Sequence, residues 1–143
     1  MDGYKYLSQI SRLKRKIVAL EIRKRTFEEL ADSIPTHPID EPRVQKDNTK
    51  AQAPFVKWID KIWDVEKAIE EAEAELKEIT NHSLAAIGRI DNADYQNILI
   101  LRFMNEMRWE DIASELNISY STCKRWYNFA LTEFEKLNGD ERL

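Results

Sequence analysis

Cysteine, glycine and proline are scarce in this chain of 143 residues, which has one cysteine, three glycines and four prolines. A single cysteine, Cys123, excludes an internal disulfide, makes a zinc cluster implausible and fits a reducing cytoplasm. The small number of turn-forming residues, beside many Glu, Lys, Ala, Leu and Ile, argues against a fold with many strands. We therefore expect an all-α protein of one or two small domains.

A long apolar run and a positive net charge are also missing. No run approaches the roughly 20 residues of a membrane span, and the first residues lack a signal-peptide core, so we expect a cytoplasmic protein without membrane contact. The net charge of −4 gives no bulk signal for nucleic acid. However, residues 12–25 are strongly basic and residues 66–78 strongly acidic. Such blocks can pair with each other, so the bulk charge excludes no partner.

Patterns for catalysis or cofactor binding are absent as well. The chain has no Gly-rich phosphate loop and no Ser/His/Asp constellation. His37 and His82 lie far apart in the sequence and are expected at the surface. Adjacent acids such as Glu70 and Glu71 point apart on a helix and form a solvated face. We therefore expect no enzyme activity, no cofactor and no metal site.

Two series of apolar residues with spacings of four and three are the main positive signal. The first predicts a helix over about residues 3–33, interrupted only at Lys24: Tyr6, Ile10, Leu13, Ile17, Leu20, Phe27, Ala31 and Ile34. The second predicts a helix from Pro54, a residue suited to a first turn, to about residue 88. Its members are Trp58, Ile62, Val65, Ile69, Ala72, Leu76, Ile79, Ser83, Ala86 and Ile90.

The proline-rich, polar segment 35–54 between the two helices is expected to be a linker. Helices this long need a partner, and the basic first helix beside the acidic second favours an antiparallel hairpin over a DNA-backbone patch on the basic run. A second copy of the chain can extend the hairpin into a homo-oligomer. We assign residues 1–90 to a helical hairpin or coiled-coil oligomerisation region. Trp58 fits its seam, and Trp63 is expected to contact the first helix or another subunit. For both tryptophans a core role is favoured over a binding site.

After Gly88 the pattern changes to short helices, and residues 91–143 are assigned to a DNA-binding domain. Asp91 resembles an N-cap, with Asp94 in the first turn. The apolar spacing predicts three helices, over about 92–105, 109–116 and 120–137.

The last two of these helices have the spacing of a helix-turn-helix. Ala113 is small enough for two helices to cross closely, and Asn117, four residues later, suits a positive φ. Ile118 fills the corner, and Ser119 caps the next helix. Cys123, ten residues after Ala113, packs behind the second helix. Its inner stripe continues with Trp126, Tyr127, Ala130, Leu131 and Phe134. The alternative is a plain three-helix bundle.

In a helix-turn-helix, the N-terminal residues of the second helix face the bases in the major groove. Arginine can bond the edge of guanine, while hydroxyls and backbone N–H groups at a helix start suit phosphate. A cap role is favoured for Ser119, and DNA contact is favoured over solvation for Lys124 and Arg125. The predicted DNA-binding residues are Ser119, Tyr120, Ser121, Thr122, Lys124, Arg125 and Asn128.

The segment ILILRFMNEMRWEDIASELNISYSTCKRWYNFAL resembles the region 4 helix-turn-helix of sigma-70 factors. Its W-x-x-I-A-x-x-L core is similar to the RinA-like and ArpU-like phage transcriptional regulators. The stretches YKYLSQISRLKRKI and IDKIWDVEKAIEEAEAELKEI are similar to the helical N-terminal half of those regulators. The resemblance implies a sequence-specific regulator that binds double-stranded DNA, contacts RNA polymerase and activates phage or mobile-element late genes in a bacterial host.

Three positions depart from the family pattern. Arg108 stands where such helices usually have a Ser or Thr cap, and Cys123 replaces the usual Val. Phe129 stands where a polar or basic residue is usual. It either contacts a partner, such as RNA polymerase or a second copy, or packs on helix 92–105.

Two other functions remain open. The first is a small terminase-like DNA-packaging subunit, although there the DNA-binding domain usually comes first. The second is a protein-interaction adaptor that does not bind DNA, which the net negative charge of residues 91–143 favours.

Overall fold

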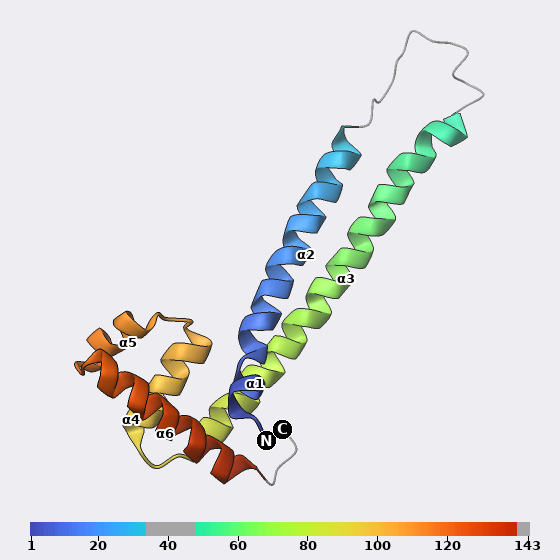
Figure 1. Cartoon of the computed structure of the whole chain (residues 1–143). Coiled ribbons are helices and arrows are strands. Elements are labelled where there is room, and N and C mark those ends of the chain that lie inside the picture. The colour runs from blue at the N-terminus through green and yellow to red at the C-terminus, as the bar shows by residue number, and fades with distance from the viewer. Residues whose placement is uncertain (34–47, 140–143) are drawn as a thin grey trace. The chain divides into compact units, whose positions relative to one another are not determined.

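The computed structural model describes residues 1–33 and 48–139, with side chains from residue 55 onward in the second range (Figure 1). The fold is all-α, as expected, and the described ranges contain no strand. The helices are α1 (Gly3–Leu7), α2 (Gln9–Asp32), α3 (Asn48–Ile87), α4 (Ala93–Leu99), the π-helix η2 (Ile100–Met104), α5 (Trp109–Leu116) and α6 (Tyr120–Asn138). Among these helices, none is apolar over a length that would cross a membrane. Ile34, the last member of the first apolar series, lies outside the described residues, as do His37 and the linker residues 35–47.

Two helix starts differ from the sequence expectation. Helix α3 begins at Asn48, so Pro54 lies inside it and removes one backbone hydrogen bond instead of opening the helix. Residues 50–53, KAQA, are strong helix formers, and this propensity extends the helix past the proline on its N-terminal side. The expected cap Asp91 was wrong as well. Asn92 caps α4, because its Oδ1 accepts from the N–H groups of Asp94 at 2.9 Å and Tyr95 at 3.3 Å.

The chain forms two compact units that do not follow the sequence order. Unit 1 comprises Met1–Lys14 and Ala74–Leu143, and unit 2 comprises Arg15–Glu73. The functional boundary expected at residue 90 remains a prediction, since the units are defined by packing and not by function.

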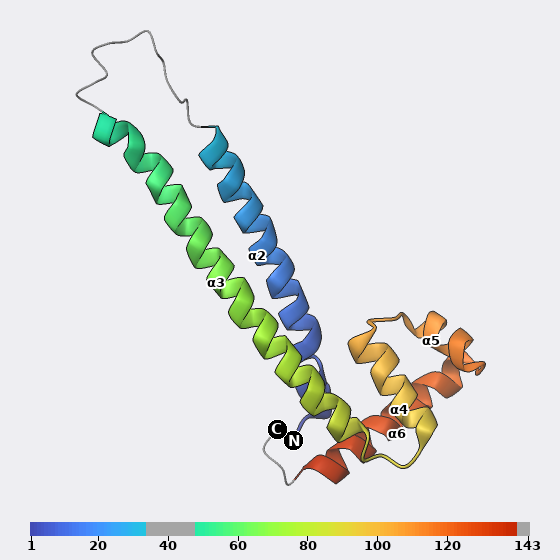
Figure 2. The same ribbon diagram turned by 180° about the vertical axis from the view of Figure 1, so that it is seen from behind.

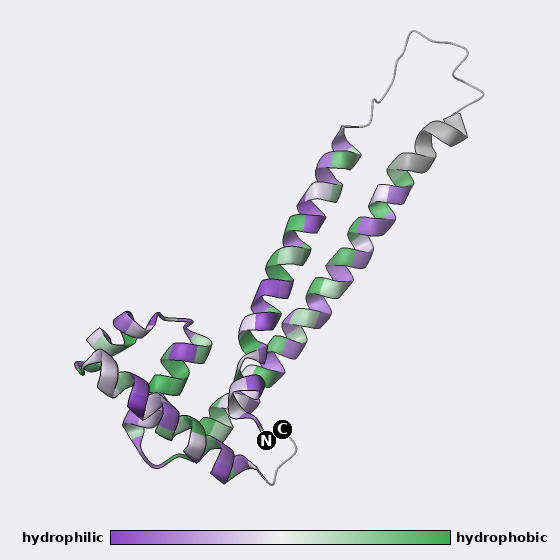
Figure 3. Ribbon diagram, viewed as in Figure 1, coloured by the Kyte–Doolittle hydropathy of each residue, from purple (hydrophilic) through white to green (hydrophobic). Residues whose placement is uncertain are grey.

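In unit 2, α2 and α3 run antiparallel and side by side in both views (Figures 1 and 2). Apolar residues recur at intervals along two otherwise hydrophilic helices (Figure 3). The predicted seam is confirmed, because its members are buried or half-buried: Ile17, Leu20, Phe27, Ala31, Trp58, Ile62, Val65, Ile69 and Ala72. The rings of Phe27 and Trp58 lie 5.6 Å apart between centroids. These contacts fix the register of the two helices.

The charged and aromatic residues of unit 2 bring one confirmation and one correction. Lys24, which interrupts the seam, is half-buried, and its Nζ lies 3.6 Å from the carboxylate of Glu66 on α3. The expected pairing of the basic and acidic runs is thus present at this position. The core position favoured for Trp63 was wrong, because its side chain is 67% exposed. It follows the seam residue Ile62 by one position, and one step along a helix turns the side chain by about 100°.

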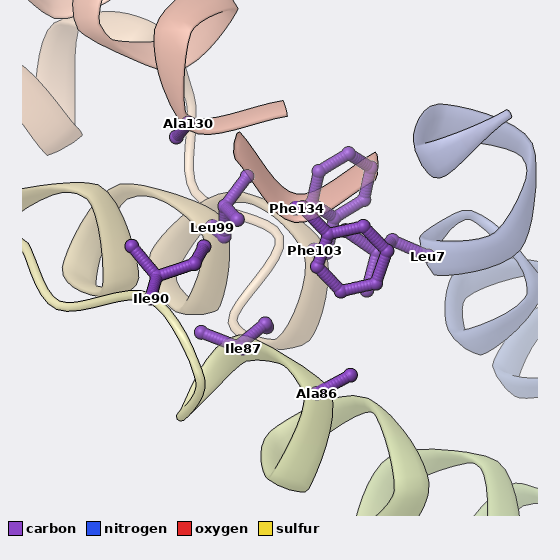
Figure 4. Packing of buried hydrophobic residues seen from close by; sticks show 8 residues of the cluster. All are labelled: Leu7, Ala86, Ile87, Ile90, Leu99, Phe103, Ala130 and Phe134. Carbon is purple, nitrogen blue, oxygen red and sulfur yellow. The ribbon is translucent and has the colours of Figure 1, made fainter. Parts of the chain in front are cut away.

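Unit 1 has a core built from both ends of the chain. Leu7 of α1 packs with Ala86 and Ile87 of α3 and with Phe134 of α6 (Figure 4). The cluster is completed by Ile90, Leu99, Phe103 and Ala130. Tyr6 stacks on Phe134 at 6.3 Å between ring centroids. The first residues of the chain therefore belong to the same core as the last helix.

Polar contacts join the same elements of unit 1. The Gly3 N–H donates to the Glu135 carboxylate at 2.6 Å. The fully buried Asn138 donates from Nδ2 to the carbonyls of Ala86 at 3.3 Å and Phe134 at 3.0 Å. Its Oδ1 accepts from Arg89 at 2.8 Å. All the amide groups of this buried side chain thus have partners, as burial of a polar group requires.

The helix expected over 92–105 divides into α4 and η2. The Asn105 N–H donates to the Ile100 carbonyl at 3.1 Å, a bond between residues five apart that defines a π turn. The ammonium of Lys14 donates to the Met104 carbonyl at 2.7 Å and lies 3.8 Å from the Glu106 carboxylate. Lys14 thus holds the end of η2 and the turn that leads to α5.

Candidate nucleic-acid interface

The turn between α5 and α6 has the geometry that the sequence predicts. Asn117 is left-handed, with φ 59° and ψ 47°. The Ile118 N–H donates to the Ala113 carbonyl at 3.0 Å, which closes a Schellman-type helix end. Asparagine is the non-glycine residue best suited to this backbone conformation. Asn117 therefore sets the angle at which α6 leaves α5.

Ser119 is the N-cap of α6, as expected. Its Oγ accepts from the Thr122 N–H at 3.1 Å and donates to the Thr122 hydroxyl at 2.8 Å. The cap satisfies one of the N–H groups that a helix start leaves without a partner. The two hydroxyls are occupied with each other, so in this structure both stabilise the start of α6.

The inner side of the helix pair is a separate apolar cluster. Ile98, Ile112, Ala113 and Cys123 are buried there, and Ile118 packs against them with Leu101, Met107, Trp109, Leu116, Trp126 and Tyr127. Burial raises the pKa of the Cys123 thiol, although the charge of Lys124 acts in the opposite direction. At neutral pH the thiol is uncharged and serves as a small apolar side chain. The inner positions predicted for α5 and α6 are thus confirmed.

The outer face of α6 carries four of the predicted DNA-binding residues. Tyr120, Ser121, Arg125 and Asn128 are all exposed within the first half of the helix. Ser121, Arg125 and Asn128 recur at spacings of four and three, so they lie on one stripe. The positive end of the helix dipole lies beside this stripe and favours an anion such as phosphate.

Lys124 has a different environment from Arg125. Its Nζ lies 4.3 Å from the centroid of the Trp109 ring, and the side chain is half-buried. The guanidinium of Arg102 lies 4.3 Å from the same centroid and donates to the Met107 carbonyl at 2.9 Å. Two cations thus share one indole ring, an arrangement that stabilises both through cation–π attraction.

Arg102 and Trp109 were not among the predicted site residues. The available signal was an aromatic residue at the first position of α5, with Arg102 seven residues before it. The π turn in η2 changes the direction of side chains between these positions, so spacing alone does not bring the two together. Tyr127 closes the cluster with its ring 4.6 Å from that of Trp109. Burial raises the pKa of Tyr127, while Arg102 acts to lower it and Tyr4 to raise it.

Arg108 and Phe129, two of the departures from the family pattern, also have defined environments. Arg108 occupies the N-cap of α5 without a side-chain cap bond, and its Nε lies 3.4 Å from the Asp111 carboxylate. Instead, the carboxylates of Glu110 and Asp111 in the first turn of α5 interact favourably with the positive end of the helix dipole. Phe129 is 50% exposed, with its ring 6.5 Å from that of Tyr95 on α4. One face of Phe129 is therefore packed and the other is open.

This geometry agrees with a comparison against protein families. Residues 92–134 match the family model of sigma-70, region 4. The comparisons with curated proteins and with solved structures gave no match. The matched segment covers α4, η2, α5 and most of α6, which are the elements that form the helix-turn-helix and its support. A sigma-70 region 4 helix-turn-helix indicates a DNA-binding regulator.

Proposed function

We propose that this protein is a sequence-specific DNA-binding transcriptional regulator that reads its target with α6. The observation that carries the proposal is the exposed stripe of Ser121, Arg125 and Asn128 on the second helix of a capped helix-turn-helix. In this fold that part of the second helix enters the major groove. An arginine there can form two hydrogen bonds to guanine. The protein acts by binding, and catalysis, cofactors and metals have no part in the proposal.

The finer part of the proposal comes from the resemblance to RinA-like and ArpU-like regulators. The protein activates late genes of a phage or mobile element in the cytoplasm of a bacterial host, and it contacts RNA polymerase while bound to DNA. The half-exposed Phe129 is a candidate for the polymerase contact, because it lies near the exposed stripe of Ser121, Arg125 and Asn128 without belonging to it. The protein works as a homo-oligomer joined through its long helices.

A second candidate function is a protein-interaction adaptor that does not bind DNA. Two observations favour it. Residues 91–143 carry a net negative charge. Lys124, one of the two cations expected at the bases, lies against Trp109. The DNA-binding proposal therefore depends most strongly on Arg125, the exposed cation of the pair.

The test is DNA binding by the purified full chain to fragments of its own genetic neighbourhood and to random DNA, at several salt concentrations. Arg125→Ala is expected to weaken binding to the preferred fragment about 5- to 150-fold, as loss of one good base contact does. Lys136→Ala is the matched control, since it removes one exposed positive charge from the last turn of the same helix. Arg125 is a cleaner target than Lys124, whose replacement also removes a contact with Trp109.

The outcome separates the two functions. A preferred fragment whose binding is lost in Arg125→Ala and kept in Lys136→Ala supports a DNA reader. Equal binding to all DNA, unaffected by Arg125→Ala, supports the adaptor and excludes sequence-specific recognition by α6. Transcription from the preferred fragment with host RNA polymerase then distinguishes an activator from a repressor.

A further inference from the structure

The side chain of Lys14 joins the start of α2 to the turn that precedes the helix-turn-helix. Its ammonium donates to the Met104 carbonyl at 2.7 Å and lies 3.8 Å from the Glu106 carboxylate. Met104 is the last residue of η2, and a carbonyl at a helix end is left without an intrahelical partner. A positive charge placed there forms a charge-assisted hydrogen bond and complements the negative end of the helix dipole. Lys14 therefore caps the C-terminal end of η2 from another helix.

The backbone that Lys14 contacts is irregular. Glu106 is left-handed, with φ 53°, and the Met107 N–H donates to the Leu101 carbonyl at 3.1 Å. A left-handed residue other than glycine costs free energy and persists only where surrounding contacts hold it. Lys14 supplies two such contacts, one to the carbonyl of Met104 and one to the side chain of Glu106. The geometry of the turn therefore depends on a residue from a distant part of the sequence.

A second cation, Arg102, holds the other end of the same turn. Its Nη1 donates to the Met107 carbonyl at 2.9 Å, and its guanidinium lies 4.3 Å from the centroid of the Trp109 ring. Trp109 is the first residue of α5, and the Nζ of Lys124 on α6 lies 4.3 Å from the same centroid. A continuous series of contacts thus leads from α2 through the turn to a predicted DNA-binding residue.

We propose that Lys14 is a positioning residue for DNA recognition. By holding the turn that precedes α5, it keeps the ring of Trp109, and with it the ammonium of Lys124, in place for DNA. This inference deepens the proposed function and rests on it. An ion pair whose side chains are 39% and 45% exposed adds little to stability. The main effect of Lys14 is therefore expected on DNA affinity and not on the stability of the fold.

Replacement of Lys14 by methionine removes the charge and leaves an unbranched side chain. Lys14→Met is expected to weaken binding of the full chain to its preferred DNA fragment about 2- to 30-fold, the range found for residues that act through others. Lys14→Arg keeps a donor and a positive charge, so it is expected to restore most of the affinity. Lys16→Met is the matched control, because Lys16 is an exposed lysine on the same helix. It removes the same charge and is expected to bind like the wild type.

Unfolding measurements separate positioning from a purely structural role. Urea unfolding, monitored by circular dichroism, shows whether each variant is fully folded under the binding conditions. A structural role would lower the free energy of unfolding of Lys14→Met and leave the dissociation constant of the folded protein unchanged. That result, or equal losses of affinity in Lys14→Met and Lys16→Met, would overturn the inference.

The double variant Lys14→Met/Lys124→Met tests the route through Lys124. If Lys14 acts by keeping Lys124 in place, the double variant is expected to bind about as weakly as Lys124→Met alone. Losses of affinity that multiply would show that the two lysines act independently, as they do if Lys14 contacts DNA itself. In that case Lys14 is not a positioning residue, and the inference is wrong.

A measurement without DNA distinguishes failure of this inference from failure of the proposed function. The NMR signal of the Trp109 indole N–H, assigned with Trp109→Phe, is expected to shift in Lys14→Met and to keep its position in Lys16→Met. An unchanged signal in Lys14→Met contradicts the inference whatever the DNA result. If the wild type prefers no fragment, the proposed function fails and the inference fails with it. A fragment that Arg125→Ala no longer binds and Lys14→Met binds normally contradicts the inference alone.

Discussion

The helix-turn-helix of unit 1 and the helix pair of unit 2 are specified by the sequence in different ways. In the helix-turn-helix, single residues hold single positions: Asn117 makes the turn and Ser119 makes the cap. In unit 2 the same seam position recurs every three or four residues, and no single one decides the structure. Single residues at single positions determine one backbone geometry. A repeated seam tolerates exceptions such as Lys24, and it determines which side of a helix is apolar without determining which partner buries that side.

The largest expected effect tests whether unit 1 depends more strongly on one residue than unit 2 does. Phe134 is fully buried and lies in the core that joins Leu7 to α3. Phe134→Ala is expected to lower the free energy of unfolding by about 3–5 kcal/mol, since it removes a buried ring and leaves a cavity. Phe27→Ala in unit 2 is expected to cost less, because that ring is half-buried. Urea unfolding, monitored by circular dichroism, measures the loss of unfolding free energy in each variant. Equal losses in the two variants would contradict the expected difference between the units.

A smaller effect is expected at the turn. Asn117→Val places a β-branched residue at φ 59° and is expected to cost about 1–3 kcal/mol, as a strained left-handed residue does. Asn117→Gly relieves that strain and is expected to be close to neutral. The same unfolding measurement on both variants checks this. A large loss in the glycine variant would mean that the asparagine side chain, and not its backbone, makes the turn.

The smallest effect is expected at the exception in the seam. Lys24→Leu removes a partly exposed ion pair with Glu66, which is worth at most about 1 kcal/mol, and adds apolar area to the seam. Stability is expected to rise, by about 1 kcal/mol or less. A clear loss of stability would show that this lysine determines the pairing of the helices, and unit 2 would then resemble unit 1 in its reliance on a single residue.

Local and periodic features of the fold could be predicted from the sequence. The seam, the left-handed Asn117 and the Ser119 cap each follow from a residue type at a fixed spacing, and the structure confirms all three. The packing of residues 3–7 with α6 could not be predicted, because no periodicity links segments so far apart in the chain. The Asn92 cap was missed since Asp91 is an equally good capping residue one position earlier.

The candidate site was predictable only in part, for a related reason. The exposed positions of Ser121, Arg125 and Asn128 follow from the inner stripe of α6, because the outer face of a helix is fixed once its inner face is known. The contact of Lys124 and Arg102 with Trp109 depends on the π turn of η2 and brings together η2, α5 and α6. Such contacts arise from three separate segments, and a single sequence contains no signal for their meeting.

The place of the first 14 residues has a consequence for the modularity of this protein. The unit that carries the helix-turn-helix takes Leu7 into its core and ties Gly3 to Glu135 and Lys14 to Met104. The segment that follows residue 90 is therefore not an independent domain that can be excised and fused to another protein, because its core includes residues from the start of the chain. Exchange of the whole segment 15–73 would preserve the core, so new sequence is best accommodated in the middle of the chain.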